Sequence, residues 1–215
     1  MFDLESGALC LDFANTVDWH NSDHPDDALK DYSVLIEWGR AAGILASDQA
    51  EKLGQVAKNQ SKEAIVAYES AMQLRESVYR IFANYSEQES VDLNDLGILN
   101  RALSKSLSHL HINLSDRGFD WEFTESPNGL DQIVWPVARS AGELLVSDRL
   151  NRVRQCADDR GCGYLFIDTS RNRSRLWCSM ESCGNRAKAR RHYLRKQKKK
   201  TAYKPDASKT LPGGN

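Results

Sequence analysis

Four cysteines near the C-terminus are spaced like the ligands of a metal ion. Five residues separate Cys156 from Cys162, four separate Cys178 from Cys183, and fifteen lie between the two pairs. Two close pairs at such a distance are typical of a structural zinc site with four thiolates. Each pair supplies two ligands from one loop, and the segment between them folds back as a hairpin. The pattern predicts a zinc-ribbon-like module that holds one structural Zn²⁺ ion.

Disulfides and redox-active thiols are the alternatives for these cysteines. The N-terminus, MFDLESGALC, lacks the basic and continuous apolar regions of a secretory signal. No stretch approaches the roughly 18 apolar residues of a membrane span. We therefore expect a cytoplasmic protein without a membrane partner, in which thiols stay reduced. Four thiolates leave zinc no open position, so the expected site is structural, and without a redox context they favour zinc over iron.

Charge is distributed very unevenly along the chain, although the formal net charge is only −1. Residues 1–148 hold 11 Lys/Arg and 25 Asp/Glu, a net charge of −14. Residues 149–200 hold 16 Lys/Arg and 4 Asp/Glu, a net charge of +12, and 186–200 contain nine basic residues and no acidic one. A solvated helix usually mixes both signs. The asymmetry therefore predicts an acidic body followed by an arm that binds a polyanion.

Hydrophobic periodicity indicates a mostly helical body. Apolar residues recur every three or four positions, most clearly in 61–85. In contrast, 110–114 and 119–123 alternate apolar and polar residues around the turn sequence SDRG, which is typical of a β-hairpin. Pro136 either kinks the last expected helix or marks its start. Further helices are expected over 33–46, 93–107 and 130–150. Ser47 and Asp48 are the expected cap of one more helix, which follows the first of these.

These patterns divide the chain into three parts. Residues 1–148 are expected to form a helical domain, 149–200 the metal-binding module, and 201–215, which contain few apolar residues, a disordered tail. The body is long enough to bury a core, whereas the module depends on its metal for folding free energy. The predicted fold class is α+β: a mostly helical N-terminal domain with a small β-hairpin, followed by a zinc-ribbon-like module that ends in a basic helix.

The residues around the last cysteine pair resemble a known family. The string CGNR (183–186), preceded by DTSRNRSR (168–175) and WCSM (177–180), closely resembles the CGNR zinc finger. In that family the finger follows an N-terminal domain called ABATE, and CLDFANTVD (10–18) resembles the opening of that domain. The resemblance covers nearly the whole chain. It implies zinc on the four cysteines, binding to nucleic acid, and a role in stress-induced regulation of transcription.

The chemistry of the module also favours a polyanionic partner. Guanidinium groups between the cysteine pairs can contact phosphates in a bidentate way. After Cys183, Gly184 permits a sharp turn and Asn185 is a suitable N-cap for the basic helix. The apolar face of this helix is too thin for a membrane surface, whereas an Arg-rich helix suits the major groove of DNA. We expect contacts to nucleic acid from Arg171, Asn172, Arg173, Arg175, Asn185, Arg186, Lys188, Arg190, Arg191, His192 and Arg195.

The body has two candidate roles, which are sensing a small-molecule effector and forming a homodimer. Asp12, Asn15 and Thr16 lie close together beside an apolar segment. They either line a polar pocket for the effector or serve as caps and hydrogen-bonding groups inside the core. The chain contains no GxGxxG, P-loop, GxSxG or HExxH motif. We therefore predict that it is not an enzyme.

Three functions remain as hypotheses. The first is a zinc-dependent transcriptional regulator that binds DNA through the basic helix. The second is an RNA-binding zinc-ribbon protein, and the third is an enzyme in the N-terminal domain that the zinc module tethers. A dimer on spaced half-sites favours DNA, and a preference for single strands favours RNA. A small molecule bound in the body favours a sensor or an enzyme.

Overall fold

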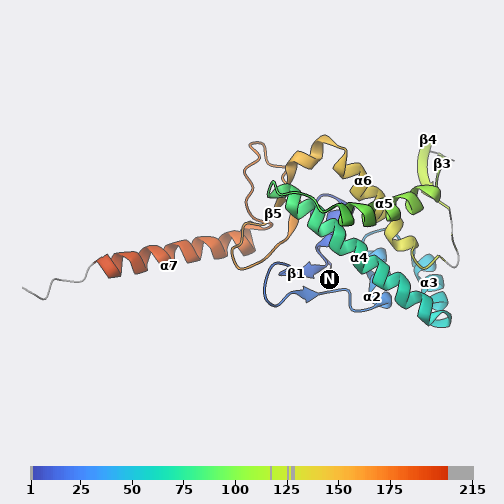
Figure 1. The fold of residues 1–215 in the computed structure, drawn as a ribbon, viewed down its shortest axis with the longest axis horizontal. Helices are drawn as coiled ribbons and strands as arrows, with labels where there is room; N and C mark the ends of the chain where they lie inside the picture. Colours follow the sequence, from blue (N-terminus) through green and yellow to red (C-terminus); the bar gives the residue numbers. More distant parts are fainter. Residues whose placement is uncertain (1, 117, 125, 127–128, 203–215) are drawn as a thin grey trace, which may run out of the picture. The chain divides into compact units, whose positions relative to one another are not determined.

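The computed structural model describes residues 2–116, 118–124, 126 and 129–202. It divides into two compact units, Met1–Cys178 and Ser179–Asn215. The first unit is mostly helical, as the sequence predicts (Figure 1). Its helices are α1 (Leu9–Ala14), α2 (Tyr32–Ala41), α3 (Ser47–Asn59), α4 (Ser61–Ser86), α5 (Leu93–Ser108) and α6 (Trp135–Leu145), with short 3-10 turns at Gln132–Val134 and Asp148–Arg152.

Short antiparallel strand pairs complete the first unit. The hairpin expected from alternation is confirmed, with Leu110 opposite Phe123 and Ser115 opposite Gly118. The pairs are β1 (Val17–Asp18) with β2 (Asp26–Asp27), β3 (Leu110–Ser115) with β4 (Gly118–Phe123), and β5 (Val153–Gln155) with β6 (Leu165–Ile167).

Several helix ends differ from the expectation. Helix α3 begins at Ser47 itself, and its capping bond comes from Gln49, whose side-chain oxygen accepts from the Ala46 N–H at 2.9 Å. Pro136 lies in the first turn of α6 and marks its start, where its missing N–H loses no helical bond. The single helix expected over 130–150 is therefore α6 flanked by two 3-10 turns.

Helix α4 is the centre of the first unit. Its buried residues Leu74, Val78, Ile81 and Phe82 recur at helical spacing and belong to one continuous apolar core. The neighbouring elements α1, α2, α3, α5, β5 and β6 all contact it. Figure 1 shows α4 as a long helix that crosses the body, with α3 near one end and β5 near the other. The core therefore includes residues from both sides of position 149, next to which we expected a domain boundary.

Asn15 joins the β5–β6 pair to α1. Its side-chain oxygen accepts from the Leu165 N–H at 2.8 Å, and its amide donates to the Leu165 carbonyl at 2.8 Å. The Ile167 N–H donates to the Ser6 carbonyl at 2.8 Å. Leu165 and Val153 are fully buried in the same core. This packing explains why the first compact unit extends to Cys178.

The second unit begins with a π-helical turn (Met180–Gly184) that leads directly into α7 (Asn185–Ala202). The expected sharp turn at Gly184 and N-cap at Asn185 are wrong. The Gly184 N–H bonds to the Ser179 carbonyl at 2.9 Å, and the Asn185 side chain donates to the Glu181 carbonyl at 3.1 Å. A Cβ at residue 184 would lie 2.9 Å from the Met180 sulfur, so the Met180 side chain packs closely against the backbone there.

Of the expected disordered tail, Thr201 and Ala202 belong to α7, and residues 203–215 lie outside the described residues. Among the described residues, none of the helices has the length and hydrophobicity that crossing a bilayer requires.

The Asn15 contact predicts a large loss of stability on truncation. Replacing Asn15 with Ala leaves a buried N–H and a buried carbonyl of Leu165 without partners. We expect the free energy of unfolding to fall by about 2–4 kcal/mol, measured by urea denaturation. The matched control is Asn59→Ala at an exposed position of α3, which should change it by less than about 0.5 kcal/mol. Equal effects of the two substitutions would contradict this role of Asn15.

Candidate metal centre and basic helix

The four predicted cysteines form one cluster. The sulfur atoms of Cys156, Cys162, Cys178 and Cys183 all lie within 4.8 Å of one another, and none is in a disulfide. The Cys162 and Cys178 sulfurs are 3.8 Å apart. Tetrahedral zinc with Zn–S bonds of about 2.3 Å separates its ligand sulfurs by about 3.8 Å. The donor set therefore fits a single zinc ion.

The first cysteine loop is shaped by the β5–β6 pair. Cys156 follows β5 directly, and its N–H donates to the Tyr164 carbonyl at 2.9 Å, which extends the ladder by one bond. The chain then reverses through Gly161, whose φ of +89° favours glycine. A Cβ at residue 161 would lie 2.6 Å from the Asn21 carbonyl oxygen. Only glycine therefore lets this loop approach the 19–22 segment so closely.

A buried carboxylate organises the segment between the cysteine pairs. Asp168 has no exposed surface, and it accepts from the Ser170 N–H at 2.8 Å and the Arg175 N–H at 3.0 Å. Burial opposes the charged form, but hydrogen bonds from Ser170 and Arg175 outweigh it and lower the pKa of Asp168. Beyond this turn the Cys178 N–H donates to the Cys156 sulfur at 3.4 Å. The turn thus brings the second pair of cysteines back to the first.

The proximity of the sulfurs opposes full ionisation of the thiols. Hydrogen bonds from Cys162 and Cys178 lower the pKa of the Cys156 thiol, and the same contacts raise the pKa values of the other two. A divalent cation removes this conflict because it balances the charge of the thiolates. In the second unit, the Arg186 guanidinium donates to the Cys183 sulfur at 2.8 Å and adds a further positive charge.

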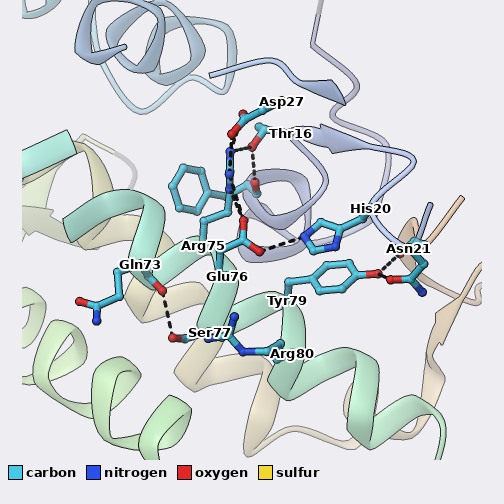
Figure 2. Close-up of polar contacts among 12 residues, drawn as sticks. Thr16, His20, Asn21, Asp27, Gln73, Arg75, Glu76, Ser77, Tyr79 and Arg80 are labelled. Atoms are coloured by element: carbon cyan, nitrogen blue, oxygen red, sulfur yellow. Dashed lines mark hydrogen bonds and ion pairs between the residues drawn. The ribbon is translucent and has the colours of Figure 1, made fainter. Parts of the chain in front are cut away.

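A polar network joins the first cysteine loop to α4. Figure 2 shows Tyr79 of α4 reaching Asn21. The Tyr79 hydroxyl lies 2.8 Å from the Asn21 side-chain oxygen and 3.0 Å from the Gly163 carbonyl, and it accepts from Gln155 at 2.8 Å. The His20 N–H donates to the Cys162 carbonyl at 3.2 Å. The backbone around Cys162 is therefore held by side chains of the body.

The same network continues through charged groups (Figure 2). The His20 ring stacks on Tyr79 with centroids 3.5 Å apart, and its Nε2 lies 3.1 Å from Glu76. Arg75 contacts Glu76 at 2.9 Å and binds both oxygens of Asp27 at 2.7 Å. Burial opposes the Glu76 carboxylate, but the His20 hydrogen bond and the Arg75 charge outweigh it and lower the pKa of Glu76. None of these residues was predicted as part of the site.

Known families match both parts of the chain. Residues 7–148 match the ABATE family, described as a "putative stress-induced transcription regulator". Residues 152–196 match the CGNR zinc finger. The chain belongs to the ABATE family. No curated protein matches the chain. The zinc-finger match and the four-cysteine cluster together assign one structural zinc ion to this protein.

The basic residues of the CGNR finger fall into two groups. Arg175 lies 4.3 Å above the Phe166 ring and donates to the carbonyls of Trp177 and Cys178, so its guanidinium supports the fold of the finger. Arg186 is half-buried beside Cys183. The remaining predicted residues have exposed side chains: Arg171, Asn172, Arg173, Asn185, Lys188, Arg190, Arg191, His192 and Arg195.

The predicted effector residues all have hydrogen-bond partners inside the protein. Asp12 accepts from the Ser6 N–H at 3.0 Å, and Asn15 binds the Leu165 backbone. The Thr16 hydroxyl donates to the Phe13 carbonyl at 2.8 Å. Asp12, Asn15 and Thr16 are all buried, and burial raises the pKa of Asp12. The structure therefore gives them the buried hydrogen-bonding role.

The ABATE domain has a cavity elsewhere. A space of about 630 Å³ lies between α4, α5 and the segment that leads into α6, and Asp12, Asn15 and Thr16 do not line it. Its lining combines apolar side chains with charged ones of both signs, Lys62, Arg101 and Lys105 together with Glu63 and Asp131. The lining includes Val66, Leu74, Ile98, Ala102, Arg101 and Lys105.

The metal centre predicts a specific zinc stoichiometry. Purified protein should contain one zinc per chain, measured by inductively coupled plasma mass spectrometry. Cys162→Ser should lower the zinc content to a fraction of one per chain, because a hydroxyl is a poor zinc ligand. The control is Cys10→Ala, which removes a fully buried thiol whose pKa burial raises to about 12. It should keep one zinc. Full zinc in Cys162→Ser would contradict the assigned ligands.

Proposed function

We propose that this protein is a cytoplasmic, zinc-dependent regulator of transcription that binds DNA through α7. The observation that carries the proposal is the continuity of metal ligand and basic helix. Cys183 lies in the π-helical turn, and α7 starts two residues later with no acidic residue along its length. Zinc on Cys183 therefore fixes where the basic helix begins. We propose no catalytic role, since the matched families are a regulator and a zinc finger.

The dimensions of α7 support DNA as the partner. Its 18 residues make a rod about 27 Å long, and an α-helix fits the major groove of B-DNA. Lys188, Arg191 and Arg195 follow one another at helical spacing and are exposed. The exposed Arg171 and Arg173 offer further phosphate contacts from the turn between the cysteine pairs. We leave Arg175 out of the proposed interface because its guanidinium is bonded within the finger.

Salt dependence provides a direct test of the α7 contacts. The affinity for DNA falls as salt rises, and each lost phosphate contact makes the negative slope of log affinity against log salt shallower by about 0.9. Replacing Lys188, Arg191 and Arg195 with Ala should therefore make the slope on duplex DNA shallower by about 3. The affinity at each salt concentration is measured by fluorescence anisotropy. The control variant loses the same charge at the exposed Lys30, Lys52 and Lys58 of the ABATE domain and should keep the slope.

Selection of sequences separates DNA from RNA. We expect zinc-loaded protein to enrich one motif from random duplex DNA, and a chelator to abolish that enrichment. Tight binding to RNA without a DNA motif would favour the RNA-binding alternative. Binding to neither nucleic acid would overturn the proposed function.

We also propose that the cavity of the ABATE domain takes the effector. A volume of about 630 Å³ is within the range of small-molecule sites. Lys105 at the rim is paired with Asp131 at 2.6 Å, whereas no ion pair joins Arg101 to another described residue. The basic Lys62 and Arg101 outnumber the remaining carboxylate, Glu63, and beside an apolar wall they suit an amphipathic carboxylate.

Three probes with one tail and different head groups test the cavity. Isothermal titration calorimetry should detect binding of decanoate, weaker binding of decanol, and no binding of decyltrimethylammonium. Arg101→Ala should weaken decanoate at least about tenfold, the order of one charge-assisted hydrogen bond, and Arg40→Ala on the exposed face of α2 should not. Equal affinity for all three probes, or no effect of Arg101→Ala, would contradict a carboxylate site.

A further inference from the structure

The β3–β4 hairpin presents a continuous apolar face to solvent. Ile112 lies opposite Trp121 and Leu114 opposite Phe119, so the four side chains share one face. Their exposed fractions are 60%, 57%, 69% and 79% in that order. The other face carries the polar residues His111, Asn113, Asp120 and Glu122. This alternation is typical of a hairpin whose apolar face is buried, but here the apolar face is exposed as well as the polar one.

Among the described residues, the ring contacts between the hairpin and the rest of the domain lie near its base. Phe123 contacts Trp135 with ring centroids 6.1 Å apart, and Arg139 lies 5.3 Å from the Trp121 ring. A two-stranded hairpin is at best marginally stable unless an apolar face packs against something. Contiguous exposed apolar patches on soluble proteins usually mark interaction sites. The hairpin therefore requires a partner along its outer half.

An apolar groove continues this face onto the helices. A space of about 490 Å³ lies between α5, α6 and the hairpin, and Trp121 belongs to both surfaces. Leu107 is 50% exposed and Val146 is 89% exposed. The groove is lined by Leu96, Leu103, Leu107, Leu110, Trp121 and Val146, among others. One molecule thus carries both an apolar projection and an apolar depression next to it.

Residues 203–215 do not have the composition to cover this surface. Residues 203–215 contain only Tyr203 and Leu211 as large apolar side chains. A second copy supplies a hairpin and a groove of matching chemistry. The charges at the groove also suit pairing with a copy, because Arg139 and Glu143, 2.7 Å apart, present both signs side by side. A two-fold interface requires a surface that complements itself in this way.

We propose that the apolar hairpin face and the adjacent groove form a homodimer interface, in which each copy's hairpin packs into the groove of the other. The arrangement is isologous and closes after two copies. This proposal deepens the proposed function, since a two-fold dimer would present two basic helices to two half-sites. It does not depend on nucleic acid and can be tested without it.

The experiment measures the molar mass of the full-length, zinc-loaded protein by light scattering after size exclusion, over about 1–100 μM. We expect twice the chain mass of 24.3 kDa. Leu114→Lys should give the monomer mass. Asn113→Lys is the matched control, because it places the same side chain at the neighbouring exposed position on the polar face. That variant should remain a dimer.

Val146→Lys tests the groove independently of the hairpin and should also give the monomer. Retained zinc content and helical circular dichroism would show that the variants are folded. A monomeric wild-type protein at 100 μM would overturn the proposal. A dimer that survives both Leu114→Lys and Val146→Lys, or a mass that grows without reaching a plateau, would do so as well. None of these results alters the salt-dependence test of α7, so the two proposals fail separately.

Discussion

The structure depends on the pairing of Asn15 with the backbone of Leu165. Both polar groups of Leu165 are buried, and without Asn15 they would lose their hydrogen bonds inside an apolar core. This single side chain, from α1, fixes the register of β6 against the ABATE domain across 150 positions of the sequence. Since β5 and β6 lead into and out of the first cysteine loop, the register also determines where Cys156 and Cys162 lie. The body, as well as the metal, therefore organises the zinc ligands.

The charged network on α4 contributes a second constraint. Arg75 is only 4% exposed, and a buried guanidinium is tolerated only where acceptors satisfy it. Asp27 binds it through two oxygens and Glu76 through one, while Glu76 also bonds His20. Removal of Asp27 would leave the buried Arg75 with Glu76 as its remaining carboxylate partner. The network thus holds the 19–27 segment in one conformation, and that segment bonds the backbone of Cys162.

The sequence predicts features that depend on local spacing. The cysteine cluster and the hairpin follow from spacing and alternation, because both signals lie within short stretches of chain. The long helix α4 likewise shows its periodicity directly. Features that depend on distant partners were missed. His20 sits in a polar loop and gives no local signal of its contacts with Glu76 and Tyr79, more than fifty positions away.

Residue type alone also misleads at two positions within the finger. Arg175 has the chemistry of a phosphate ligand, but its neighbours include two carbonyls and the Phe166 ring, which occupy its guanidinium. Asn185 has the chemistry of an N-cap, but the π-helical turn before it already supplies helical hydrogen bonds. Asp12, Asn15 and Thr16 leave two roles open in sequence because partners such as Leu165 and Arg75 are remote. At Arg175 and Asn185, contacts with neighbouring backbone carbonyls override the preference of the residue type.

Helix α4 connects the two regions of the ABATE domain to which we assign functions. Leu74 lines the cavity, and Arg75 and Glu76, which follow directly, begin the network that reaches the first cysteine loop. Tyr79, one helical turn further, bonds the Gly163 carbonyl in that loop. If the cavity takes an effector, as we propose, displacement of α4 on binding would act on Tyr79, which lies less than two turns beyond Leu74, and on His20, which stacks on Tyr79. A rigid helix with these two contacts would by itself link an effector in the cavity to the zinc ligands.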